Sequence, residues 1–215
     1  MGIGWSLSFA FLSLFCLILS IIFGAQNFKK RTEEKFSFLY AFPSELNITE
    51  RFFDNYLGNL FSIIGAISSI AFYTTFTKEY NGYNLPIIIL GIVGAISSLA
   101  MFFFTFSHLK KRFLVVIISL GVDFATCALL ILLAYQKYSI TLKNYYILCI
   151  VIPAIFLLGA AVLMVNPKFR YDIKLEDKNG AYKRKPFYVA CISEWLILLL
   201  FELCKFPIIL LIANI

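Results

Sequence analysis

The chain has 215 residues, of which 61% are hydrophobic and 14% charged, and its formal net charge is +7. Together with a mean hydropathy of +0.87, this composition excludes an ordinary soluble domain. The basic residues flank apolar segments, so their retention on the cytoplasmic side of a membrane explains the positive charge without a nucleic-acid partner.

Six apolar stretches predict membrane-spanning helices. Each holds about 20 or more residues, enough to cross a hydrocarbon layer of about 30 Å as a helix. The fold class predicted is all-α: a single six-helix transmembrane bundle covering residues 1–215. The expected spans are about 5–25, 57–76, 85–106, 113–135, 145–165 and 187–212.

Lysines and arginines fall into alternate connections between these spans. The first, third and fifth connections hold 5, 3 and 7 of them, whereas the second and fourth hold 1 and 2. Because positive loops stay on the cytoplasmic side, loops 26–56, 107–112 and 166–186 are predicted to be cytoplasmic and both termini extracytoplasmic. A bacterial cytoplasmic membrane and a eukaryotic endomembrane or plasma membrane fit equally.

The first span has no positive n-region and is longer than a signal-peptide core, so it is expected to be an uncleaved helix. The loop after it is rich in aromatic residues and reaches Pro43-Ser44-Glu45. Ser44 is predicted to cap a short helix leading to the second span. This loop is interpreted as a membrane-surface elbow or as a docking helix for a partner.

A nine-residue segment of the second span, 63–71, recurs in the third span as 92–100 with seven identical positions. Each copy holds small residues one turn apart, which let helix backbones approach closely. A helix-packing seam is predicted, and the alternative is a relic of an inverted repeat. The seam residues are Gly65, Ser69, Gly94 and Ser98.

The fourth span carries Ser119, Asp123 and Thr126 on one helical face, and Asp123 is about 10 residues past the cytoplasmic end, near mid-membrane. An ionisable residue there is a candidate for binding a proton or ligand. A satisfied structural hydrogen bond is the alternative.

In the fifth connection, Asn179-Gly180 predicts the type I′ turn of a small hairpin within 166–186.

The last span carries Glu194, Glu202 and Lys205 on a single stripe, which should face protein because buried carboxylates are costly in lipid. Glu202 and Lys205 are three residues apart and can pair along the helix. Together with Asp123 they are the candidate ligand- or proton-binding residues. Pro207 is predicted to break the helix and leave Ile208–Ile215 tilted or at the surface.

Sites of other kinds find little support in the sequence. The five cysteines lie inside apolar spans without CxxC spacing, His108 is the only histidine, and no phosphate loop or hydrolase motif occurs. We therefore assign no catalytic residue, no metal and no cofactor.

Two short patches, Glu194-Trp195 and Phe42-Pro43-Ser44-Glu45, resemble the damage-regulated autophagy modulator family of six-span membrane proteins. That resemblance implies the same number of spans. It also implies extracytoplasmic basic loops, opposite to the orientation that the loop charges predict, so no function is transferred from it.

These features predict a non-enzymatic integral membrane subunit that assembles with partner membrane proteins, with a second copy of itself, or with a ligand. The first alternative is a small transporter or solute-binding component that uses the intramembrane carboxylates in a central cavity. The second is an intramembrane lipid-modifying enzyme, which would need those carboxylates to converge at a lipid headgroup.

Overall fold

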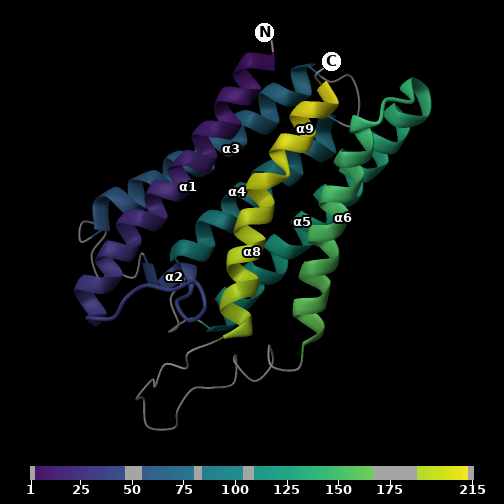
Figure 1. Ribbon diagram of the computed structural model, residues 1–215. Helices are drawn as coiled ribbons and strands as arrows, with labels where there is room; N and C mark the ends of the chain where they lie inside the picture. Colours follow the sequence, from purple (N-terminus) through teal and green to yellow (C-terminus); the bar gives the residue numbers. More distant parts are fainter. Residues whose placement is uncertain (1–2, 47–54, 80–83, 104–108, 167–187, 213–215) are drawn as a thin grey trace.

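The computed structural model describes residues 3–46, 55–79, 84–103, 109–166 and 188–212. Over these residues the chain is all-helical, as predicted, and contains no strand (Figure 1). The helices are α1 (Ile3–Thr32), α2 (Pro43–Leu46), α3 (Tyr56–Glu79), α4 (Asn84–Phe103), α5 (Leu109–Thr141), α6 (Tyr145–Val165), α8 (Val189–Leu203) and α9 (Lys205–Ile212).

Four helical segments are long and apolar enough to cross a membrane. They are Gly4–Thr32, Tyr56–Phe76, Leu85–Phe103 and Leu114–Thr141. In Figure 1, α6 and the consecutive helices α8 and α9 run along the same bundle as these four. Both ends of the chain lie at one end of the bundle and α2 lies at the other.

The outer surface of the bundle is apolar, unlike that of a soluble protein, and several polar side chains are buried between helices. Large apolar side chains such as Phe15, Ile67 and Ile155 are more than half exposed on the outer faces. Serines such as Ser13 and Ser20 are buried between helices. This arrangement suits an apolar surrounding, in which polar groups must find partners inside the protein.

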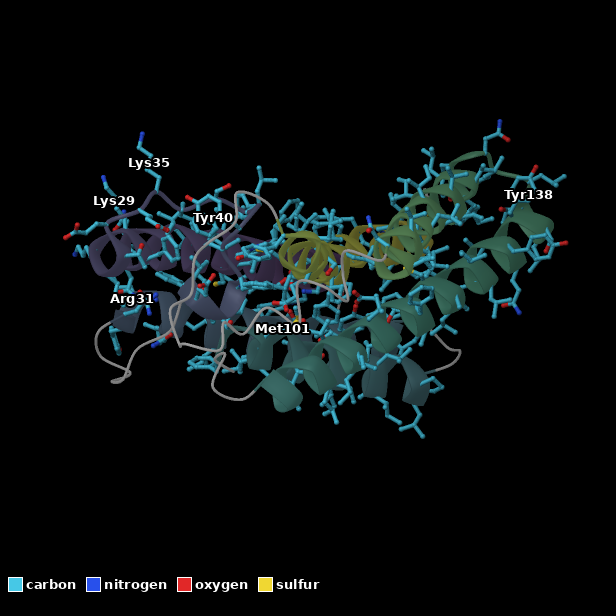
Figure 2. The ribbon with its side chains drawn as sticks, turned by 90° about the horizontal axis from the view of Figure 1, so that it is seen from below. Lys29, Arg31, Lys35, Tyr40, Met101 and Tyr138 are labelled. Carbon is cyan, nitrogen blue, oxygen red and sulfur yellow. The ribbon has the colours of Figure 1, made fainter. Side chains whose placement is uncertain are left out.

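Two helices extend beyond their apolar spans. The loop predicted to begin at residue 26 begins instead after Thr32, because α1 continues through Lys29, Lys30 and Arg31. Basic side chains in the last turn of a helix interact favourably with its dipole. Similarly, α5 begins at Leu109, inside the predicted loop 107–112. In Figure 2, seen from the α2 end, Lys29 and Lys35 project away from the helices.

Polar side chains at seven-residue intervals join α1 to α3. Ser6, Ser13, Ser20 and Asn27 recur every seventh residue of α1, a spacing that keeps them on one face. Ser6 bonds Thr75 at 3.3 Å and Ser20 bonds Ser62 at 2.6 Å. Because the α3 partners run in the opposite order, these contacts fix an antiparallel register between the two helices.

The segment around α2 is attached to the start of α8. The Trp195 indole donates a hydrogen bond to the carbonyl of Ala41 at 2.8 Å. The backbone N–H of Phe42 donates to the Glu45 carboxylate at 2.8 Å. Glu45 therefore caps α2, and the prediction for Ser44 is wrong: within the described structure its hydroxyl has no partner.

The last predicted span is divided into α8 and α9, with Cys204 between them. Pro207 lacks a backbone N–H and its ring opposes the carbonyl four residues earlier, that of Leu203. The interruption therefore lies three residues before the proline. Ile208 and Leu211 are buried, so the described part of α9 stays within the bundle, which rules out a surface position, one of the two predicted alternatives, for these residues. The predicted hairpin and His108 fall outside the described residues.

The two glycines of the predicted seam pack against different neighbours. A Cβ on Gly65 would lie 3.3 Å from the Cβ of Cys16, so this glycine lets α3 approach α1. A Cβ on Gly94 would overlap the ring of Phe201, so this glycine accommodates α8 against α4. Each glycine thus already packs against its own chain.

Replacement of Gly94 by alanine should lower stability by about 1–3 kcal/mol, because the added methyl group overpacks the contact with Phe201. Gly121→Ala is the matched control, since a Cβ at Gly121 meets no atom within 4 Å. Thermal unfolding in a mild detergent measures the difference. Equal melting temperatures for the two variants would contradict the close approach of α4 and α8.

Candidate functional site

A buried ion pair lies where α8 gives way to α9. The Lys205 ammonium is 2.6 Å from the Glu202 carboxylate. Lys205 is fully buried and Glu202 is 7% exposed. The two residues are three positions apart on either side of the helix interruption. Despite the interruption, both side chains lie on the same side of the α8–α9 segment.

Two serines from other helices complete this pair. The Lys205 ammonium donates to the hydroxyl oxygen of Ser13 at 2.8 Å and to that of Ser69 at 2.7 Å. The Ser13 hydroxyl contacts Glu202 Oε2 at 2.7 Å, and the Ser69 hydroxyl contacts Oε1 at 3.3 Å. The four side chains link α1, α3, α8 and α9. We call them the ion-pair network.

The ion-pair network satisfies the requirements for buried charge. Opposite charges are in contact, and hydroxyl groups occupy remaining positions around both. Each serine lies close to its own helix backbone as well, Ser13 at 2.9 Å from the carbonyl of Ala10 and Ser69 at 3.0 Å from that of Gly65. Serine is short enough to reach both, which suits it to this position between closely packed helices.

A cavity of about 30 Å³ adjoins the network between α1, α3, α4 and α8. Glu202, Ser62 and Ser98 are among its lining residues, together with apolar side chains such as Leu17 and Phe102. This volume holds about two water molecules. The cavity thus offers carboxylate and hydroxyl oxygens to a small polar solute.

The predicted carboxylates are shielded by protein, as expected. Asp123 is 2% exposed and Glu194 is 6% exposed. They do not, however, meet at one place. Glu194 precedes Glu202 by eight residues, about 12 Å along a helix, and the residues that line the cavity include neither Glu194 nor Asp123.

Asp123 belongs to a second polar group. Ser119 and Thr126 share its face of α5, and all three are buried. Tyr73 of α3 is 1% exposed, and its phenol oxygen has no hydrogen-bond partner within the described structure. Its ring stacks on that of Phe201 with a centroid separation of 5.9 Å.

Neither Ser13 nor Tyr73 is among the site residues predicted from the sequence. The seven-residue recurrence of polar residues in the first span was a usable signal for Ser13, because it marks a face that meets another helix. For Tyr73 there was no such signal, since tyrosine is common both in cores and at membrane interfaces.

Among the described residues no three His, Cys, Asp or Glu side chains are placed to hold a metal ion. No protein-family model, curated protein or solved structure matches the chain.

The Lys205→Met variant should be less stable by about 3–5 kcal/mol, because it leaves the Glu202 carboxylate buried without its counterion. The Lys205→Met, Glu202→Gln double variant should recover much of this loss. Unfolding of the wild type, both single variants and the double variant in detergent gives the coupling free energy. Additive losses would contradict the role assigned to the pair.

Proposed function

We propose that the chain is a six-span integral membrane protein with both termini extracytoplasmic, and that it acts as a non-enzymatic subunit. In this proposal it associates within the membrane with another membrane-spanning helix. Support comes from four long apolar helices, the exposed apolar outer surface and the alternating loop charge. Association itself needs a surface that the fold does not already use.

The outer face of α5 is the observation that favours this role. Gly121, Ala125 and Ala128 are exposed there. These small residues follow one another at intervals of four and three positions. Large exposed residues continue the same stripe on both sides, with Leu114 and Ile118 before it. Such spacing keeps the residues on one side of the helix, and we call them the α5 stripe.

The α5 stripe allows close approach of a second helix. Small side chains bring backbones near enough for dispersion and weak hydrogen bonds, which drive helix association in lipid. Gly65 and Gly94 are occupied inside the chain, so a partner has to use a different surface. The partner is a membrane protein or a second copy of the chain.

The cavity beside Glu202 favours a second candidate function, the binding or transport of a small polar solute. Its oxygen-bearing lining residues are suited to donors the size of water or ammonium. A lipid-modifying enzyme is less well supported, because Glu194 lies about 12 Å along the helix from Glu202 and neither Glu194 nor Asp123 lines the cavity beside Glu202.

Substitution of Gly121 by leucine should reduce association in the membrane at least severalfold, since the larger side chain keeps a second helix away. Gly159→Leu on α6 is the matched control, because a Cβ at Gly159 also meets no atom within 4 Å. Energy transfer between labelled copies in liposomes tests self-association, and co-purification in mild detergent tests a heteromeric complex. Unchanged results in both assays would reject the α5 stripe as the interface.

The orientation predicts different chemical accessibility at the two ends of the bundle. The five natural cysteines are buried, so cysteines introduced at exposed Lys35 or Lys143 give a clear signal. A membrane-impermeant maleimide should label Lys143→Cys in intact cells, and Lys35→Cys only after permeabilisation. The opposite labelling pattern would contradict the proposed topology and show that the chain has the inverted orientation.

A further inference from the structure

The side chains of Cys127 and Cys204 are in contact in the interior of the bundle. Their sulfur atoms are 3.7 Å apart, and both are free thiols. Cys127 is 0% exposed and Cys204 is 4% exposed. The two residues are 77 positions apart along the chain, so the spacing of cysteines in the sequence does not reveal the pair.

This contact joins α5 to the interruption between α8 and α9. Cys127 lies within α5, whereas Cys204 is the residue between α8 and α9. The backbone N–H of Cys204 donates to the carbonyl of Leu200 at 2.9 Å, so α8 holds its backbone while its side chain contacts α5. Cys204 also directly precedes Lys205. A bond between the two sulfurs would therefore attach α5 to the segment that carries the ammonium of the ion-pair network.

Two other buried cysteines have contacts of a different kind. The sulfur of Cys149 is 3.8 Å from the carbonyl oxygen of Pro207. The sulfur of Cys191 is 2.8 Å from the carbonyl oxygen of Ala41. A backbone carbonyl cannot form a covalent bond with an oxidised sulfur in the way that a second thiol can. Cys149 is thus a natural comparison for the pair, because it is also 0% exposed.

The surroundings of the pair favour a disulfide over other oxidised forms of cysteine. Both residues belong to an apolar cluster that includes Leu130 and Leu200. Sulfinic and sulfonic acids carry charge, which is costly in such an interior, whereas a disulfide is uncharged. The sulfurs have to approach by about 1.6 Å to bond, a distance that rotation of the two side chains covers.

We propose that Cys127 and Cys204 form a modification site at which a hydroperoxide converts the two thiols into a disulfide. One sulfur attacks the terminal peroxide oxygen, the O–O bond breaks, and an alcohol leaves as a sulfenic acid forms. The second thiol then displaces the sulfenic oxygen as water. Two thiols and one hydroperoxide give one disulfide, one alcohol and one water, and two electrons pass from sulfur to the peroxide.

The class of oxidant follows from the position of the pair. A hydroperoxide is uncharged, so it enters an apolar interior at lower cost than a charged oxidant. Burial slows the attack of any single thiol. A second thiol already in contact makes the disulfide-forming step intramolecular, which is the advantage that Cys127 and Cys204 have over Cys149. This assignment goes beyond the proposed function and does not depend on the α5 stripe.

The test uses the purified, reduced full chain in lipid nanodiscs. Hydrogen peroxide added to the water is compared with a lipid hydroperoxide incorporated in the bilayer, which distinguishes the two sources of oxidant. After an acid quench and alkylation of the remaining thiols, mapping without reduction should identify a peptide linked through Cys127 and Cys204. This link should form at least about tenfold faster than Cys149 is oxidised.

The melting temperature provides a second measurement. Oxidation should raise it by about 5–10 °C, because the cross-link restricts the unfolded chain, and a dithiol reductant should reverse the change. Cys127→Ser should abolish both the link and the shift. Cys149→Ser is the matched control and should retain both.

If Cys127→Ser does not fold, the peptide map of the wild type decides the question. Failure of both hydroperoxides to link Cys127 to Cys204 would overturn the modification site. So would disulfides spread equally among other pairs of cysteines, or a shift in melting temperature that persists in Cys127→Ser.

Discussion

The contact between Lys205 and Glu202 is the constraint on which the packing of the bundle depends. Removal of two charges from water is costly, and their attraction compensates only when both are in contact and fully hydrogen-bonded. Ser13 and Ser69 meet this requirement, and they belong to α1 and α3. The position of α8 and α9 is therefore coupled to the close packing of α1 on α3, which in turn depends on the absence of a side chain at Gly65.

The same physical reasoning explains why polar side chains are buried between the helices while apolar side chains cover the outer surface as well as the core. In lipid, burial of an apolar side chain against another helix gains little, because the lipid tails are equally apolar. Specific hydrogen bonds and close backbone contacts decide which helices pair. The bonds Ser6–Thr75 and Ser20–Ser62 lie on either side of the ion-pair network along α1, where Ser13 and Ser69 are joined through Lys205.

The two internal polar groups differ in how completely their polar atoms are hydrogen-bonded. In the ion-pair network every charged group has several partners, as expected for a structural element. Around Asp123 the polar atoms lack partners within the described structure, although the site is equally buried. Buried polar groups in folded proteins are nearly always paired, so these atoms are exceptions in the interior. The α5 stripe remains the surface on which the proposed assembly rests.

The amino-acid sequence by itself determined the helical class, the approximate positions of the apolar segments and the pairing of Glu202 with Lys205. Each of these depends on local composition or on spacing within one helix, which can be seen along the chain. It also implied that Asp123 must be shielded, because the cost of exposing a carboxylate to lipid holds for any fold. Only the tertiary structure decided that Ser13 completes the ion pair and that Gly94 accommodates Phe201. Those contacts join residues more than 100 positions apart, and side-chain shape across an interface is not encoded in the periodicity of either helix alone.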